Sequence, residues 1–274
     1  MASDILQQPN ATHVEYSTGS DHDHVIELSE RVGFNMHDAY YEHATAQHFW
    51  IQWRFEVLQR LLATFNPGQK IFEVGCGNGV VQQQFESLLD LPVPGCDLNY
   101  HAMANSPPGR GQRFLYNVFD QRDEWRNHFE TILLLDTLEH IEMPTQFLKA
   151  IANHLQPDGL LVINVPATPW LYSRYDKVQG HVRRYTFPQL ESELESAGFK
   201  IQSHSYWGVN VVPIAAIRKL LVTFAREDDV LTRGFAPPGK LAERLLRGLM
   251  KLELNGIRLP GTGTSLAAIA IRTS

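Results

Sequence analysis

Apolar residues recur along this chain in two alternating patterns, helix faces and short continuous runs. Trp50, Trp53, Val57 and Leu61 share one face of a predicted helix, and the segment from Lys70 to Val74 is predicted to be the strand that follows it. Further strands are predicted to end at Asp97 and to span Phe114–Val118, Ile132–Leu135, Leu160–Val165, the residues from Phe199, and Leu266–Ile271. Because strands and helices alternate, we expect an α/β fold whose mostly parallel sheet is covered by helices on both faces.

Turn and cap residues mark where some of these elements begin and end. The run Gln156-Pro157-Asp158-Gly159 predicts a turn between a helix and a strand. Thr186 and Gln189 fit a capping box at the start of another helix, and Gly198 is expected to end that helix.

The two ends of the chain depart from the alternating pattern. Residues 1–35 are polar and lack a sustained apolar period, so they are predicted to be a mobile tail before one domain of residues 36–274. Within that domain, residues 207–262 carry helical patterns that interrupt the alternation. Helix periodicity fits a packing helix pair or a cap over a ligand pocket, and we adopt the helical cap as the working hypothesis.

Charge and cysteine content narrow the class of partner. The chain has 24 Lys and Arg against 30 Asp and Glu, a formal charge of −6, which argues against a broadly basic surface for nucleic acid. Two cysteines and a first segment without signal-peptide features predict a cytoplasmic location. The apolar stretch Val209–Ala225 is interrupted by Pro213, Arg218 and Lys219, so no membrane span is expected.

One stretch of the chain is rich in metal-binding residue types. The run Asp21-His22-Asp23-His24 lacks partners at a useful spacing, so we expect a solvated segment and no metal site anywhere in the chain.

A glycine-rich turn follows the first core strand and carries the clearest chemical signal. Gly75, Gly77 and Gly79 precede a predicted helix, where backbone can approach a ligand and the helix offers unpaired N–H groups. Asp97 lies 22 residues after Gly75, at the spacing of an acid that receives two ribose hydroxyls. Val80 stands where a dinucleotide motif requires glycine, so a nicotinamide-dependent oxidoreductase is the second choice.

These residues resemble the class I S-adenosylmethionine-dependent methyltransferases of the small-molecule type. The turn Glu73-Val74-Gly75-Cys76-Gly77-Asn78-Gly79 is similar to that family's first motif, and Asp97 to its ribose-binding acid. Residues 129–141 (FETILLLDTLEHI) and 155–160 (LQPDGL) resemble its fourth strand and the approach to its fifth. The resemblance covers roughly residues 45–205. It implies S-adenosyl-L-methionine as cofactor and a Rossmann-like seven-stranded sheet of order 3-2-1-4-5-7-6 with an antiparallel seventh strand.

The resemblance also implies roles for cofactor-binding residues. Gly75, Gly77 and Gly79 would line the methionine part, Asp97 would hold the ribose and Leu98 would pack on the adenine. Either Asn117 or Asp120 could meet the adenine amine, because the expected acid of the third strand aligns with Asn117. The remaining predicted cofactor contacts are Tyr40, Trp50, Arg54, Glu73, Cys76, Asn78 and Val118. Arg54 suits a carboxylate partner, and its alternative is a surface arginine.

Candidate residues for the acceptor side follow the fourth and fifth strands. Asp136 and His140 lie where open α/β sheets bind ligands, and His181 lies in a long loop and is the candidate base. The same loop supplies candidate acceptor-binding residues, namely Trp170, Tyr172, Tyr175, Arg183, Arg184 and Tyr185. The arginines would suit an anionic acceptor group, and the alternative is that the loop residues tie the loop onto the domain.

The sequence therefore favours methyl transfer from S-adenosyl-L-methionine to a small molecule at oxygen, by in-line displacement. A nitrogen, carbon or protein acceptor, the oxidoreductase, and a non-catalytic cofactor-binding subunit remain alternatives. The pattern predicts nothing about oligomeric state.

Overall fold

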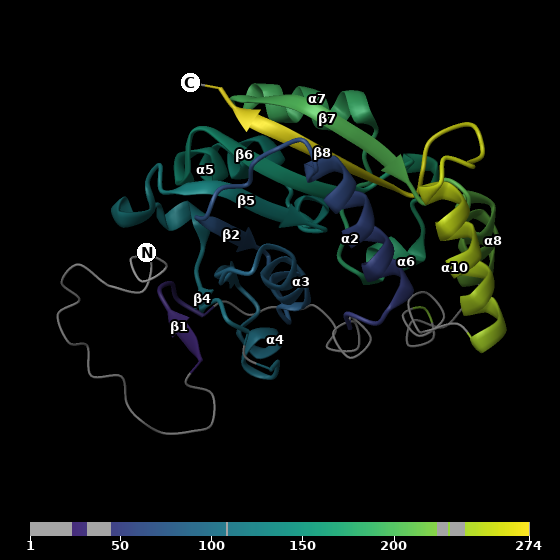
Figure 1. The fold of residues 1–274 in the computed structure, drawn as a ribbon, viewed down its shortest axis with the longest axis horizontal. Helices are drawn as coiled ribbons and strands as arrows, with labels where there is room; N and C mark the ends of the chain where they lie inside the picture. Colours follow the sequence, from purple (N-terminus) through teal and green to yellow (C-terminus); the bar gives the residue numbers. More distant parts are fainter. Residues whose placement is uncertain (1–23, 32–44, 108, 224–229, 231–238, 274) are drawn as a thin grey trace.

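One eight-stranded sheet runs through the centre of the molecule (Figure 1). The computed structural model describes residues 24–31, 45–107, 109–223, 230 and 239–273, so Tyr40 and Asp21 to Asp23 lie outside the described residues. The strands are β1 (Val25–Glu27), β2 (Ile71–Val74), β3 (Gly95–Asp97), β4 (Arg113–Leu115), β5 (Phe129–Leu135), β6 (Leu155–Pro166), β7 (Phe199–Trp207) and β8 (Ser265–Arg272).

The strands lie in the order β1-β4-β3-β2-β5-β6-β8-β7. Neighbouring strands are parallel except at β8, which is antiparallel to both β6 and β7. Without β1, this is the sheet order that the sequence resemblance implies, and the α/β fold with an antiparallel last strand is confirmed.

The predicted strand count was one too low, because β1 adds an eighth strand at the sheet edge. β1 lies inside the predicted tail and pairs in parallel with β4, with Val25 opposite Arg113. The backbone N–H of Leu28 donates to the carbonyl of Leu115 at 2.9 Å, and His24 contacts the carbonyl of Met103 at 3.0 Å. β1 lies in a polar segment that lacks a sustained apolar period, which is why the pattern did not predict it.

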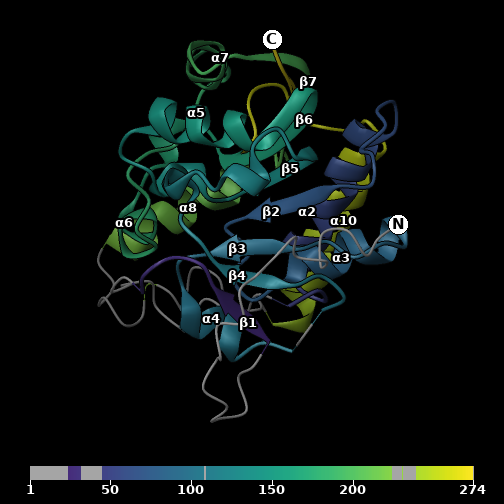
Figure 2. The ribbon, with the colours of Figure 1, turned by 90° about the vertical axis from the view of Figure 1, so that its left-hand side faces the viewer.

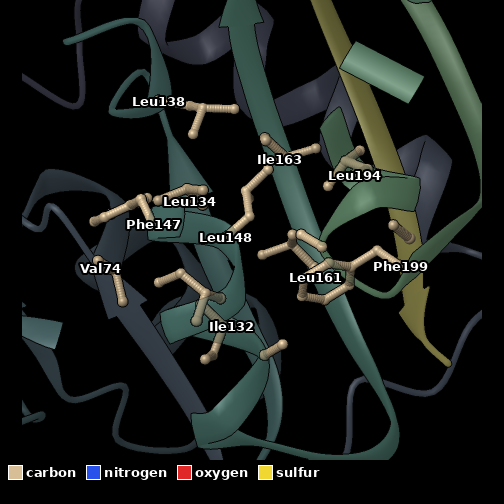
Figure 3. Close-up of a cluster of buried hydrophobic side chains, with 14 of the residues drawn as sticks. Val74, Ile132, Leu134, Leu138, Phe147, Leu148, Leu161, Ile163, Leu194 and Phe199 are labelled. Carbon is tan, nitrogen blue, oxygen red and sulfur yellow. The ribbon is translucent and has the colours of Figure 1, made fainter. Parts of the chain in front are cut away.

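Helices cover both faces of the sheet (Figure 2). On one face α2 (Phe49–Leu62), α3 (Val80–Leu89) and α10 (Lys240–Leu254) pack around a shared core. On the other face lie α5 (Pro144–His154) and α7 (Phe187–Ser196), whose side chains Leu148 and Leu194 pack against Leu161 and Ile163 of β6 (Figure 3). The shorter helices are α4 (Tyr100–Ala104), α6 (Arg174–Val178) and four 3-10 segments at Val118–Asp120, Asp123–Trp125, Leu138–His140 and Pro169–Leu171.

Local signals set the ends of several elements. Thr186 is the N-cap of α7, and the backbone N–H of each of Thr186 and Gln189 donates to the other's side chain, so the capping box is confirmed. The turn predicted at residues 156–159 is present within the bounds of β6, which begins at Leu155, and Asp158 adopts a left-handed φ of 60°. The pairing with β5 passes from Phe129 opposite Leu155 to Thr131 opposite Leu160, so residues 156–159 bulge out of the ladder. β4 ends at Leu115, three residues before the predicted end.

Within the described residues of the insertion 207–262, the helices α8 and α10 contact different parts of the domain. α8 (Val212–Thr223) lies beside α6, with the guanidinium of Arg218 4.5 Å from the centre of the Tyr175 ring. α10 packs against α2, and Arg247 donates to the side-chain oxygen of Gln52 at 2.5 Å.

Within the part of the chain that the structure describes, none of the helices has the length and apolar character needed to cross a bilayer.

Candidate functional site

A cavity of about 260 Å³ lies at the carboxyl ends of β2, β3, β4 and β5. Parallel strands carry their ligand-binding loops at this edge, so side chains distant in sequence meet here. The predicted site residues that line the cavity are Arg54, Glu73, Gly75, Cys76, Gly77, Asn78, Asp97, Leu98, Asn117, Val118, Asp136 and His140. Most of the predicted cofactor-binding residues and two of the predicted catalytic residues, Asp136 and His140, thus line the same cavity.

The glycine turn between β2 and α3 is packed too tightly for side chains. Gly75 has φ of 82°, and a Cβ built on it would lie 2.2 Å from Oγ1 of Thr137. Gly79 is the N-cap of α3 with φ of 73°, and its Cβ would lie 2.3 Å from the buried guanidinium of Arg113. Glycine alone suits Gly75 and Gly79, and Gly75 and Gly77 form one wall of the cavity.

Asp97, at the end of β3, presents its carboxylate to the cavity while the backbone holds it in place. Its two oxygens accept from the N–H of Gly77 at 2.8 Å and of Asn99 at 2.7 Å. Burial raises the pKa of Asp97, and these N–H donors oppose that effect. Each oxygen retains a second lone pair, so the carboxylate can still accept from a sugar diol.

Glu73 is the least solvated carboxyl group of the turn, with 1% of its surface exposed. Burial raises its pKa to about 8, although the charges of Arg54 and Arg113 act in the opposite direction. This group is therefore largely protonated near neutral pH when the site holds no further cation.

Arg54 and Asp136, predicted for the cofactor and the acceptor respectively, form an ion pair with each other. Asp136 also accepts from the side-chain amide of Asn164 at 2.5 Å, and Asn164 in turn accepts from the indole N–H of Trp207 at 2.8 Å. The chain of contacts fixes both charged groups at the cavity wall, and Asp136 adopts a left-handed φ of 53°. Arg54 is buried, so it is not the surface arginine that was its alternative.

Three of the predicted cofactor residues do not reach the described cavity. Asp120 is exposed, and one of its oxygens accepts from the hydroxyl of Ser29 at 2.5 Å, whereas Asn117 lines the cavity. Trp50 packs on Trp207 with ring centres 4.5 Å apart. Gly79 lies at the N-cap of α3 and does not line the cavity. Tyr40 lies outside the described residues.

His140 and His181 meet beside the cavity, with ring centres 4.9 Å apart at a nearly perpendicular angle. Nδ1 of His140 lies 3.3 Å from the carbonyl of Gly180, and Nδ1 of His181 lies 3.2 Å from the carboxylate of Asp176. Burial, together with the neighbouring His181, lowers the pKa of His140 to about 4, so this ring is neutral near neutral pH. His140 lines the cavity and His181 stands behind it.

The other predicted acceptor residues hold the loop in its place in the structure. Arg184 is buried and donates to Asp176 at 2.7 Å, and Arg183 donates to the carbonyl of Glu142 at 2.9 Å. The hydroxyl of Tyr172 donates to the carbonyl of His181 at 2.7 Å. Tyr175 and Tyr185 are buried, and Trp170 is 56% exposed. These side chains fit the alternative that the loop is tied to the domain, and their contact with an acceptor stays a prediction.

Several residues of the site were not selected from the sequence. Ile51, Tyr116, Thr137, Ile141 and Phe147 also line the cavity. Tyr116 and Thr137 directly adjoin the predicted residues Asn117 and Asp136, so their position at strand ends was a usable signal. Glu139 also directly adjoins the predicted residue His140, and Asp176 lies five residues before His181, but their contacts with the two rings depend on burial and ring orientation.

Comparison with known proteins places the chain among methyltransferases. A family model described as "Methyltransferase domain" matches residues 41–204. The ubiquinone biosynthesis O-methyltransferase of Shewanella pealeana is 25% identical over 101 residues, 34% of this chain and 41% of that protein. The mitochondrial enzyme of the same name from Schizosaccharomyces pombe is 22% identical over 103 residues, 35% of this chain and 38% of that protein. The match thus spans about two fifths of the length of these relatives.

Solved structures share the fold at low sequence identity. Phosphoethanolamine N-methyltransferase 2 of Haemonchus contortus, solved with phosphomonomethylethanolamine and S-adenosylhomocysteine, has a TM-score of 0.53 at 20% identity. That match covers 82% of this chain and 53% of that one. A methyltransferase of Archaeoglobus fulgidus described as SAM-dependent has a TM-score of 0.51 at 14% identity, covering 85% of this chain and 98% of that one.

Proposed function

The chain belongs to the methyltransferase domain family, and we propose that it is an S-adenosylmethionine-dependent methyltransferase that methylates an oxygen atom of a small-molecule acceptor. The observation that supports this proposal is the meeting of two sets of residues at one cavity. The glycine turn and Asp97 line one part of it, and Asp136 and His140 line another.

The first set fits the cofactor in shape and in hydrogen-bonding capacity. We assign the methionine part to the backbone of Gly75 and Gly77, the ribose hydroxyls to Asp97, and the adenine to Leu98 and Asn117. Glycine leaves the space that a Cβ would fill, and the Asp97 carboxylate keeps lone pairs for two hydroxyls. When bound, S-adenosylmethionine supplies a methyl group on a positively charged sulfur. The residues of the chain position the acceptor in line with that group and exclude water.

The second set supports oxygen as the methylated atom. A hydroxyl acceptor must lose a proton during methyl transfer, which requires polar groups at its side of the cavity. His140 is neutral near neutral pH and has His181 behind it, and the carboxylate of Asp136 lies at the same wall. The curated relatives named above are O-methyltransferases by their names, which agrees with this choice.

We further propose that residues 207–262 act as a cap over the acceptor, within a domain that covers residues 36–274. α8 contacts α6, which leads into the loop carrying His181, and α10 packs on α2, which carries Arg54. The insertion therefore touches α2, which supplies residues to the cavity, and α6, which precedes the loop of His181. Exposed apolar side chains on α8, such as Ile217 and Leu220, are available to contact an apolar acceptor.

The proposal is tested by incubating the purified protein with S-adenosylmethionine and a panel of phenols, catechols, carboxylated phenols and amines. Release of S-adenosylhomocysteine and an O-methylated product, identified by mass spectrometry, is the expected result. His181→Ala should lower kcat by about 100-fold or more, because proton-transfer groups contribute at least that much. Its dissociation constant for S-adenosylhomocysteine should stay within about twofold, since His181 does not line the cofactor end.

The matched control is His101→Ala, which removes an exposed histidine of α4 away from the cavity and should leave kcat unchanged. Methylation of the amines alone would reject oxygen as the acceptor atom. A His181→Ala enzyme with the wild-type kcat, measured where the chemical step limits turnover, would remove His181 from the reaction.

A further inference from the structure

Glu139 is a buried carboxyl group whose two side-chain oxygens receive no hydrogen bond from the described residues. Only 1% of its surface is exposed, and neither of its side-chain oxygens has a hydrogen bond within the described part of the chain. Burial of a polar group without hydrogen bonds is costly, and natural proteins keep such groups rarely. A ligand that binds both oxygens would remove this cost.

His181 directs one ring nitrogen toward Glu139. Its Nδ1 lies 3.2 Å from Asp176, which is fully buried and also accepts from Arg184 at 2.7 Å. Since a carboxylate accepts only, the tautomer of the neutral His181 ring that fits this contact has its proton on Nδ1 and its lone pair on Nε2. That Nε2 lies 3.9 Å from an oxygen of Glu139, too far for a hydrogen bond.

The ring of His140 also has a hydrogen-bond acceptor at its Nδ1. Its Nδ1 lies 3.3 Å from the backbone carbonyl of Gly180, which also accepts only, so Nε2 is the nitrogen with a lone pair. One ligand atom from each of Glu139, His140 and His181 lies within 4.8 Å of those of the other two. An acceptor behind each imidazole N–H, here the buried Asp176 for His181 and the backbone carbonyl of Gly180 for His140, is the arrangement that orients metal-binding histidines in proteins.

We propose that Glu139, His140 and His181 bind a divalent metal ion at the edge of the cavity, and that Asp176 is the positioning residue for His181. Two imidazoles and one carboxylate suit Zn²⁺, Co²⁺ or Mn²⁺ better than Mg²⁺, which prefers oxygen ligands. Ligand atoms around a tetrahedral ion lie about 3.3 Å apart. Side-chain rotations that shorten the present separations of up to 4.8 Å by about 1.5 Å or less would therefore close the site. Three protein ligands leave a coordination position for a further oxygen.

This inference rests on the proposed function for its role, because His140 borders both the metal site and the cavity. The ion holds the hydroxyl of the acceptor and lowers its pKa, as metal ions do for bound water. The hydroxyl proton passes to solvent, and the acceptor oxygen bonds to the methyl carbon. The bond from that carbon to sulfur breaks, with its electron pair left on S-adenosylhomocysteine. His181 then contributes as a ligand of the ion and not as a direct base.

Metal binding is measured without cofactor or acceptor. Full-length protein is freed of metal with a chelator and titrated with Co²⁺, followed by visible absorption and by calorimetry. We expect one ion per chain, with the absorption bands of a tetrahedral or five-coordinate site. Glu139→Gln should weaken Co²⁺ affinity by more than about 100-fold, whereas Asp176→Asn should weaken it by about 10 to 100-fold, the usual range for an outer partner.

His101→Asn is the control for adventitious binding by histidine and should retain the wild-type affinity, because His101 is exposed on α4. Thermal melts of all variants establish that each is folded, and Glu139→Gln removes the carboxyl ligand while keeping the side-chain volume. The proposal is overturned if the wild-type protein binds no Co²⁺ at one site, or if Glu139→Gln binds it as tightly as the wild type.

Activity separates this inference from the proposed function. A protein that O-methylates its acceptor equally well after metal removal would reject the metal site and leave the function standing. A protein that binds Co²⁺ through Glu139 but methylates none of the oxygen acceptors would support the site and contradict the function.

Discussion

At the scale of single residues, the carboxyl groups of Glu73 in the glycine turn and of Asp97 at the end of β3 have different hydrogen-bond partners. Asp97 receives two backbone N–H groups, whereas Glu73 has one side-chain oxygen without a hydrogen bond within the described residues. Burial raises the pKa of both, and that of Glu73 to about 8. Of these two groups, Asp97 is the one whose oxygens both accept backbone N–H groups, and such bonds favour the ionised form, which agrees with its proposed contact with sugar hydroxyls.

Glu73 makes the stability of the cofactor-free protein depend on pH. Its pKa is about 8 when folded and near the ordinary 4.5 when unfolded, so the folded state binds the proton more tightly. Stability from this group is therefore full below about pH 4.5 and falls as pH rises to about 8, by at most about 5 kcal/mol. Urea unfolding of the wild type and Glu73→Gln across this range should show the loss in the wild type alone. Parallel pH curves for the two proteins would contradict it.

The proposed cofactor contacts could be predicted from the sequence because they belong to a local motif. The residues that distant loops bring together could not be predicted in this way. Gly75, Gly77 and Asp97 follow from their spacing along the chain and line the cavity together. Glu139 and Asp176 belong to the same histidine cluster, yet 37 residues separate them in the sequence. Their contacts with the two histidines depend on burial and on the orientations of the rings, which cannot be predicted from the spacing of residues along the chain.

At the scale of elements, boundaries were predictable where a side chain bonds to the backbone next to it. The capping box of α7 is such a case, since Thr186 and Gln189 satisfy each other within one turn. The extra edge strand β1 and the long β6 depend on pairing with β4 and β5, which local composition does not determine. Elements that depend on tertiary pairing were therefore the ones misjudged in length or number.

Thr186→Ala should lower the free energy of unfolding by about 1 kcal/mol, because it removes the acceptor for the N–H of Gln189 at the start of α7. Chemical denaturation provides the measurement. Ser196→Ala, at the exposed carboxyl end of the same helix, is the control and should change stability by less than about 0.5 kcal/mol. Affinity for S-adenosylhomocysteine should be equal in all three proteins, and a Thr186→Ala protein as stable as the wild type would contradict the role of the cap.

At the scale of the whole molecule, the cavity joins loops from four strands, so a ligand bound there stabilises a large part of the sheet. S-adenosylhomocysteine at 100 times its dissociation constant should add about 2.7 kcal/mol of stability. For a chain of this size, that corresponds to a rise of roughly 5 to 10 °C in Tm.

Asp97→Ala should lose about 1.5 to 3 kcal/mol of cofactor affinity, as expected for charged hydrogen bonds. At the same ligand concentration, its stabilisation should fall to about 0.3 to 1.3 kcal/mol. Differential scanning fluorimetry of both proteins provides the measurement, with a nicotinamide dinucleotide as the control ligand that shifts neither Tm. Equal shifts in the two proteins would reject the role of Asp97.

Cys76 and Cys96, the two cysteines of the sequence, are both buried, and burial raises the pKa of each thiol well above its ordinary value. Alkylating reagents attack the thiolate, so both native sulfurs should be inert to maleimide dyes while the protein is folded. A single cysteine introduced on the exposed side of α10 would then carry a fluorophore at one defined place. The emission of that fluorophore would report movement of the insertion during turnover, in a protein that retains its native thiols.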